Sequence, residues 1–399
     1  MADPFRVCGQ FAWASSVNTA AVEPDSQRSP AVHRPYPVLD AIHSHHRPVR
    51  RPWIFVIAIV ILAAVGAGIG YHLAVPERPT TIHGVVGSEK SSFFSDPRVQ
   101  NVFARHGLRV DVDPRGSGEM STTVPLGRYD FAFPGSEQAA ERIRQVRPAV
   151  DSYAPFASPL AVATFTPIVD LLATQGVVHR AAEGHQVLDL AKFLDLARRD
   201  VRWDQLPGNV VYPARRDILL STTHPSDSSS AASYAWLAAR QLGDNGSVVD
   251  QVVRLFADQG GLERSTEDPF QKYLTQALDF APLVLAYEAQ YVEAIRTGLL
   301  PRNGTLLYLS PTVRSVHTLV AFTGPGGEVG RLLNTDAGLV RLAAEHGFRT
   351  ADESVSAAVL AGVSAGGAAL PGRISDVVEP PASAAIESLL TTLDVRLRP

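Results

Sequence analysis

The sequence predicts an α/β fold with largely parallel sheets, preceded by one membrane-spanning helix. Between about residue 80 and residue 352, short β-rich runs alternate with helical runs. This alternation is typical of sheets covered by helices. Ahead of it lies one uncharged apolar run, residues 53–75. As a helix, that run would reach roughly 35 Å, which is long enough to cross a bilayer.

The residues that flank the apolar run indicate its orientation. Arg47, Arg50 and Arg51 precede it, whereas the PERPTT that follows carries one acid and one base. Basic residues stay on the cytoplasmic side, so we expect a single-pass plasma-membrane protein with residues 1–52 in the cytoplasm and the main domain outside. A cleaved signal peptide or a buried core helix is the alternative. The lead-in of about fifty residues and the lack of an A-x-A-like site favour an uncleaved anchor.

The cytoplasmic segment and the anchor each carry one further signal. Residues 1–52 are rich in Pro, Ser, Ala and Arg without apolar periodicity, so we expect a disordered tail. Gly66 and Gly70 form a G-x-x-x-G in the apolar run, a spacing that lets two membrane helices pack closely. Glycine is common in membrane helices anyway. The motif therefore leaves two alternatives, a homodimer through Gly66 and Gly70 or two glycines with no role in association.

Composition argues against several classes of function. The net charge is −4 and the isoelectric point about 6.3, and there is no basic stripe with interleaved aromatics, so no nucleic-acid partner is expected. Cys8 is the only cysteine, so neither a disulfide nor a thiolate metal site is expected in the external part. The histidines lack metal-ligand spacing, so no metal or cofactor is expected. The excess of arginine over lysine is typical of a high-GC, actinobacterial-type genome.

The elements follow in chain order from hydrophobic periodicity. Strands are predicted at 81–87, 108–113, 129–135, 210–213, 217–225, 305–311 and 315–324. Helices are predicted at 92–107, 136–146, 188–199, 228–243, 271–280 and 334–347, the last closed by Gly347. The runs 159–173, broken by Pro167, and 281–290 are apolar throughout. The C-terminal tail, 353–399, is expected to hold short helices near 354–362 and 382–393.

Four turns share one design, in which a strand leads through small hydroxyl or glycine residues into a helix. They are Gly87-Ser88-Glu89-Lys90, Arg115-Gly116-Ser117-Gly118-Glu119, Pro134-Gly135-Ser136 and Pro225-Ser226-Asp227-Ser228-Ser229-Ser230. Free N–H groups and the helix dipole attract anions to such a turn, and serine hydroxyls add donors. Ligands gather at the carboxyl ends of strands in open α/β sheets. Each serine taken alone is equally well explained as a helix cap.

In this order the motifs resemble those of type II periplasmic solute-binding proteins, the extracellular receptors of ABC importers, over roughly residues 80–352. The turn at Ser88 resembles the family's first ligand loop, and Gly116-Ser117-Gly118 resembles the glycine-serine loop of the phosphate-binding branch. Ser228-Ser229-Ser230 resembles that branch's second-lobe S-G-T, with Ser229 in place of the glycine. The run PLVLAYE, which ends in Tyr287 and Glu288, resembles a second-lobe strand. The run AEHGFR, ending in Arg349, resembles the terminal G-F-R.

The resemblance implies two lobes joined by crossing strands, with the ligand in the cleft and hinge closure on binding. The expected boundaries are an external domain of 76–352, with lobe 1 at about 80–164 and 306–352, lobe 2 at about 165–305, and crossings near 163–167 and 307–311. The candidate ligand-binding residues are Ser88, Lys90, Arg115, Ser117, Ser136, Ser228, Ser229, Ser230 and Tyr287.

These residues favour the capture of a small anionic or polar solute. The protein would serve an ABC-type importer, with a permease or other membrane protein as partner, or a sensing role. Ser229 is expected to narrow or abolish the site, because it adds a side chain where the family has glycine. A ligand-free envelope scaffold is the main alternative, because a membrane anchor is unusual for importer receptors.

Two further alternatives have less support in the sequence. Ser88 and Lys90 lack the S-x-x-K spacing of a serine–lysine enzyme, and no G-x-S-x-G elbow is present. The chain is therefore expected not to be an enzyme, and no catalytic residue is assigned. Asp227 and Ser229 begin the metal motif of adhesion domains, but Ala231 removes its last ligand.

Overall fold

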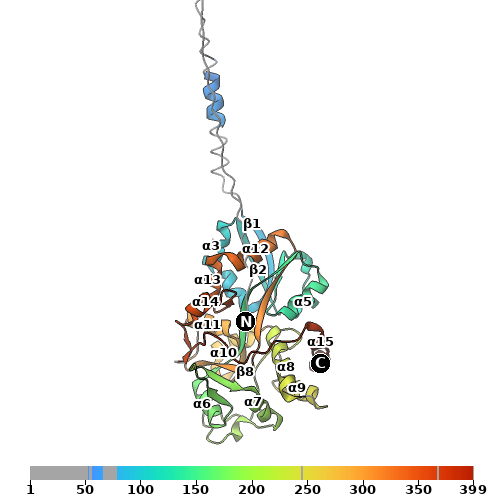
Figure 1. The fold of residues 1–399 in the computed structure, drawn as a ribbon. Coiled ribbons are helices and arrows are strands. Elements are labelled where there is room, and N and C mark those ends of the chain that lie inside the picture. Colours follow the sequence, from blue (N-terminus) through green and yellow to red (C-terminus); the bar gives the residue numbers. More distant parts are fainter. Residues whose placement is uncertain (1–52, 54–55, 66–78, 244–245, 366–367, 399) are drawn as a thin grey trace, which may run out of the picture. The chain divides into compact units, whose positions relative to one another are not determined.

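The computed structural model describes residues 53, 56–65, 79–243, 246–365 and 368–398 (Figure 1). By its contacts the chain divides into residues 1–75 and residues 76–399. In the first unit, residue 53 and residues 56–65 are helical, with exposed side chains. No helix among the described residues has both the length and the apolar composition needed to cross a membrane. The predicted tail, the remainder of the predicted anchor and the Gly66/Gly70 motif lie outside the described residues.

Lobe 1 of the second unit is built on five neighbouring strands in the order β2-β1-β3-β9-β4. These strands are β1 (Thr80–Gly87), β2 (Leu108–Arg115), β3 (Phe131–Phe133), β4 (Asp151–Phe165) and β9 (Arg314–Ala321). Strand β1 is parallel to β2 and β3, whereas β9 is antiparallel to β3 and to the first part of β4. The short β10 (Arg349–Thr350) pairs with β4.

Helices cover both faces of this lobe-1 sheet (Figure 1). They are η1 (Ser88–Lys90), α2 (Ser91–Ser95), α3 (Pro97–Arg105), α4 (Glu119–Thr122), η2 (Leu126–Arg128), α5 (Glu137–Val146), α12 (Gly324–Thr335) and α13 (Ala337–Glu345). The aromatic side chains Phe93, Phe94 and Phe131 are buried in the lobe-1 core. The predicted helix 92–107 is in fact two helices, because Asp96 is extended before Pro97 and caps α3 through Arg98 N.

Lobe 2 continues from the second part of β4, which pairs with β7 and β8. Its strands are β5 (Val178–Arg180), β6 (Gln186–Asp189), β7 (Val284–Tyr287) and β8 (Gly304–Ser310). Its helices are α6 (Thr166–Thr174), α7 (Leu190–Arg198), η3 (Trp203–Gln205), α8 (Ser229–Leu242), α9 (Val248–Ala257), α10 (Glu267–Gln276), η4 (Ala277–Asp279) and α11 (Glu288–Arg296). Its hydrophobic core is separate from that of lobe 1 and includes Trp203, Tyr234 and Tyr273.

The connections between the lobes make the sheet mixed, so the prediction of largely parallel sheets is wrong. The chain passes from lobe 1 to lobe 2 within β4 and returns through β8 and β9. The two crossing paths run in opposite directions and therefore pair antiparallel. The partner of β4 changes from β9 to β8 between Pro159 and Leu160–Ala161, which lies before the predicted crossing at 163–167. The return crossing follows Ser310.

The C-terminal tail packs on both lobes rather than trailing from them. It contains α14 (Glu353–Leu360), β11 (Ser364–Ala365), β12 (Ala368–Ala369) and α15 (Ser383–Leu397). Thr312 in the return crossing donates to Asp376 O at 3.0 Å and accepts from Val378 N at 2.9 Å. Helix α15 contacts α5 of lobe 1 and α8 and α9 of lobe 2 (Figure 1). The tail therefore contacts the crossing segment and also bridges the two lobes.

A buried histidine connects α11 to lobe 1 and gives a pH prediction. His346 Nε2 lies 3.1 Å from Asp96 Oδ2, and its Nδ1 lies 3.0 Å from Glu293 Oε2. Burial favours a higher pKa for Glu293, but contacts with His346 and Arg296 outweigh burial and lower that pKa to about 2. Ionised Glu293 therefore stabilises the fold above its unfolded-state pKa of about 4.5, and this contribution is lost as the pH falls towards 2.

The measurement is urea denaturation at about pH 6 and about pH 3, a window that spans part of this titration. We expect the Glu293→Gln variant to lose less stability between the two pH values than the unaltered chain. An identical pH dependence in both proteins would contradict a stabilising charge on Glu293.

Candidate functional site

The loops at the carboxyl ends of β1, β2 and β3 meet lobe 2 directly. Gly118 N donates to Asp227 O at 2.8 Å, and Ser265 Oγ donates to Ser88 Oγ at 2.5 Å. A Cβ on Gly118 would lie 1.8 Å from the Ser226 carbonyl oxygen. This approach excludes every residue except glycine. The two lobes are therefore closed on each other at the predicted cleft.

The close approach of Gly118 gives a second prediction. Gly118→Ala sets the new methyl against a backbone oxygen that no side-chain rotation can move, so the interlobe loops must shift. We expect the free energy of unfolding to fall by roughly 1–3 kcal/mol. The control is Gly127→Ala, because a Cβ there meets nothing within 4 Å. Urea denaturation measures both, and equal stability of the two variants would show that the lobes are not in contact at Gly118.

Serine hydroxyls from both lobes converge at the starts of α5 and α8. Ser136 Oγ lies 2.9 Å from Ser229 Oγ across the two lobes. Ser136 also caps α5 by accepting from Ala139 N at 3.2 Å. Ser228 instead places its hydroxyl 2.9 Å from both Ser230 Oγ and Thr266 Oγ1. Both helices begin at these serines, so the positive dipole ends of α5 and α8 lie close to the paired hydroxyls, an arrangement that favours an anion.

A buried ion pair lies beside these hydroxyls. Lys90 is fully buried, and its Nζ lies 2.5 Å from Glu89 Oε1 and 4.8 Å from the centre of the Phe133 ring. Burial lowers the pKa of Lys90, and the Glu89 charge partly opposes this shift. Ser117 Oγ accepts from Gly135 N at 2.9 Å. Burial and then the Glu89 charge raise the pKa of Tyr287, so its phenol stays protonated.

The structure brings most of the predicted ligand-binding residues together. They are Ser88, Lys90, Ser117, Ser136, Ser228, Ser229, Ser230 and Tyr287. Arg115 is placed elsewhere, because it is exposed and donates to the Pro114 carbonyl at 2.8 Å. Sequence reasoning did not assign Glu89, Ser265, Thr266 or His317 to the site. Glu89 stands within one of the four turns, whereas nothing in the sequence around His317 in β9 indicates that its Nδ1 lies 3.7 Å from Glu89 Oε1.

The two remaining motifs form a structural ion pair next to the crossing strands. Glu288 is fully buried, and its carboxylate lies 2.8 Å from both Nε and Nη2 of Arg349. The Tyr308 hydroxyl donates to the same carboxylate at 2.5 Å. Arg349 also donates to the Pro371 and Gly372 carbonyls of the tail. Glu288 is therefore fully engaged in holding β7, β8, β10 and the tail together.

Helix α15 covers the seam between the lobes. Arg142 of α5 pairs with Glu387 at 2.9 Å, and Arg398 pairs with Asp227 of lobe 2 at 2.7 Å. Leu393 is fully buried. A hollow of about 480 Å³ remains beside the helix, lined by residues of both lobes and of α15. To reach the serine cluster, a solute would therefore have to enter past α15 or through the seam after the two lobes separate.

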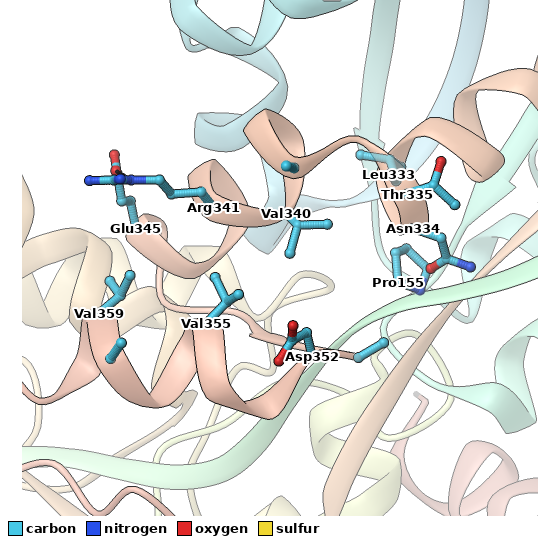
Figure 2. A pocket seen from close by; sticks show the side chains of 13 residues that line it. Pro155, Leu333, Asn334, Thr335, Val340, Arg341, Glu345, Asp352, Val355 and Val359 are labelled. Carbon is cyan, nitrogen blue, oxygen red and sulfur yellow. Dashed lines mark hydrogen bonds and ion pairs between the residues drawn. The ribbon is translucent and has the colours of Figure 1, made fainter.

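A larger groove, of about 820 Å³, lies between α13 and α14. Figure 2 shows Val340 of α13 facing Val355 and Val359 of α14, with Arg341 and Glu345 at one end. None of the predicted ligand-binding residues lines this groove. It is separate from the serine cluster and carries no group that the cluster uses.

Comparison with known proteins supports the fold. No protein-family description matches the sequence, and no curated protein is significantly similar to it. A periplasmic thiamin-binding protein is 9% identical with a TM-score of 0.53, covering 80% of this chain and 96% of that protein. The periplasmic binding protein P5PA is 9% identical with a TM-score of 0.50, covering 80% and 100%. The sulfate-binding protein SubI of Mycobacterium tuberculosis H37Rv is 16% identical over 70% and 90%, with a TM-score of 0.46.

Such low identities establish the architecture and not the ligand. The match extends over 96% of the thiamin-binding protein and 100% of P5PA. Both lobes of these proteins are therefore matched. The part of the chain after residue 79 has the two-lobed α/β fold of periplasmic solute-binding proteins.

Proposed function

We propose that this protein binds a small anionic solute between its two lobes. One observation carries the proposal: Ser136 at the start of α5 and Ser229 at the start of α8 come from opposite lobes and meet at 2.9 Å. Buried hydroxyls and two helix starts supply donors to an oxyanion without a full countercharge. Lobe closure brings both halves of this donor set together.

The experiment is thermal-shift screening of the full-length chain with phosphate, sulfate, molybdate and organic acids. A ligand at 100 times its dissociation constant adds about 2.7 kcal/mol of stability, so a clear rise in melting temperature is expected for at least one anion. The Ser136→Ala variant should lose most of that rise, whereas Ser152→Ala, at an exposed serine of the same lobe, should keep it. No stabilisation by any anion at millimolar concentration would contradict the proposal.

A ligand-free scaffold is the second candidate, and a specific observation favours it. The lobes are sealed by a backbone hydrogen bond between Gly118 and Asp227, and α15 bridges the seam. Direct contact between the lobes makes the domain rigid, and a rigid surface suits a protein whose role is to bind other proteins. Failure of every anion in the thermal-shift screen would favour this function.

We also propose that residues 53–75 anchor the protein in the plasma membrane, with residues 1–52 inside and the two-lobed domain outside. The uncharged apolar run and the arginines before it support this orientation. A tethered binding protein of this kind would deliver its solute to an ABC permease or report it across the membrane. In intact cells, we expect Cys8 to resist an impermeant thiol reagent and to react after permeabilisation. Labelling of Cys8 without permeabilisation would show that residues 1–52 lie outside the cell and would contradict the proposed topology.

A further inference from the structure

Glu89 and Lys90 form an ion pair between neighbouring residues of one buried turn. Glu89 is 8% exposed and Lys90 is 0% exposed, and both belong to η1 at the carboxyl end of β1. A buried ammonium is costly unless an opposite charge accompanies it. The Glu89 carboxylate supplies that charge at 2.5 Å. The chain thus carries its own counter-ion inside the predicted anion site.

The Glu89 carboxylate lies where the loops of lobe 1 meet lobe 2. Gly135 lies next to this carboxylate. An ideal Cβ built on Gly135 would lie 3.1 Å from Glu89 Oε1, 3.3 Å from the Tyr287 hydroxyl and 3.4 Å from Ser117 Oγ, so these three polar atoms surround one point. The next residue, Ser136, makes the hydroxyl contact with lobe 2. A carboxylate oxygen therefore stands among donors contributed by three of the four turns and by β7.

The donors around this carboxylate outnumber its acceptor oxygens. Both ring nitrogens of His317 are buried without a hydrogen-bond partner among the described residues, and the neutral ring has one N–H to donate. His317 Nδ1 lies 3.7 Å from Glu89 Oε1, which is too far for a hydrogen bond. Lys90 has three N–H donors, and Glu89 Oε1 is the acceptor that the described residues give it. Buried donors without acceptors are costly, so the site favours a ligand that brings several acceptor oxygens.

We infer that Glu89 is an intramolecular substitute for the anionic solute and the residue that limits anion affinity. In this structure its carboxylate holds the place beside Lys90. A bound oxyanion must displace this carboxylate from Lys90, and its oxygens then also accept from the N–H of His317. Oxyanions with several oxygens around one centre compete best, because one carboxylate cannot reach all these donors. The inference rests on the proposed capture of an anion.

The test replaces Glu89 by glutamine, which keeps the shape and removes the charge. Isothermal titration of the full-length chain with inorganic phosphate, and separately with sulfate, measures the dissociation constant. We expect Glu89→Gln to bind at least one of them about tenfold more tightly than the unaltered chain, since a buried competing charge is gone. Glu328→Gln removes one exposed charge from the same lobe and should leave the affinity unchanged.

A double variant keeps the test decisive if Glu89→Gln alone folds poorly. Glu89→Gln with Lys90→Met removes both buried charges, a change that proteins often tolerate, and it should bind phosphate and sulfate no more tightly than the unaltered chain. Tighter binding by the double variant would show that Lys90 is not the group that the carboxylate occupies, and would overturn the inference. Equal or weaker binding by Glu89→Gln would overturn the role of Glu89 and leave the proposed function standing. Binding by Glu89→Gln but not by the unaltered chain would support Glu89 as the limiting residue and reject solute capture by the natural protein. No binding by either protein would reject both.

Discussion

Replacement of Glu288 by glutamine is expected to lower the free energy of unfolding by about 3–5 kcal/mol, the loss typical of a buried charge that has lost its partner. The Glu288 carboxylate receives two contacts from Arg349 at 2.8 Å and one from the Tyr308 hydroxyl. The Tyr308 hydroxyl and most of the Arg349 guanidinium are buried. Water cannot replace the missing carboxylate, so the Arg349 charge would remain inside without compensation.

Urea denaturation of the Glu288→Gln variant measures this loss. Glu288→Gln combined with Arg349→Met should recover a large part of the stability, because no unpaired charge is left in the interior. Glu328→Gln breaks an exposed pair with Arg331 and should change the stability by no more than about 1 kcal/mol. If Glu288→Gln were as mild as Glu328→Gln, the Glu288–Arg349 pair would not be buried in solution.

Replacement of Leu393 by alanine is the second large expected effect. Leu393 is fully buried in α15, and Ile386 and Leu390 of the same helix are each 4% exposed. Truncation of a buried leucine leaves a cavity and typically costs about 2–5 kcal/mol. We therefore expect this loss in the free energy of unfolding from a single residue of the C-terminal tail.

The matched control lies two positions further along the helix. Val395 is 75% exposed, so Val395→Ala should have little effect on urea denaturation. A limited-proteolysis assay gives a second readout, since loosening of α15 should speed cleavage near the C-terminus in Leu393→Ala only. Equal behaviour of the two variants would show that α15 does not pack on the lobes, and the seam between them would then be open to solvent.

The predicted elements agree with the structure where the local hydrophobic pattern and the tertiary packing favour the same secondary structure. The runs 81–87, 136–146 and 228–243 overlap β1, α5 and α8, whose apolar residues repeat with the strand or helix period. Pro167 marks the first turn of α6 rather than a break inside one element.

Three segments depart from their local pattern. The predicted strand 217–225 is wrong, because Asp217, Ser221 and Thr223 make only isolated bridges and the segment forms no continuous ladder. The predicted strand 210–213 is an irregular loop, because the Asn209 side chain bonds the backbone of Val211 and Tyr212 and Val210 is exposed. Helix α12 was not predicted, since its glycines disfavour a helix. A Cβ on Gly326 or Gly330 would collide with Asp130 O or the Tyr153 ring, so close packing on lobe 1 both requires these glycines and holds the helix.

The sequence by itself determined the alternation of strands and helices and the positions of the serine-rich turns, because these depend on residues close together along the chain. Tertiary structure decided which turns meet. It placed Arg115 at the surface, brought His317 of β9 beside Glu89, and folded α15 over the seam. Such contacts join residues far apart in sequence, and their geometry depends on how β4, β8 and β9 cross between the lobes. Glu89 and Lys90 are neighbours in the sequence, but their burial beside His317 depends on that packing.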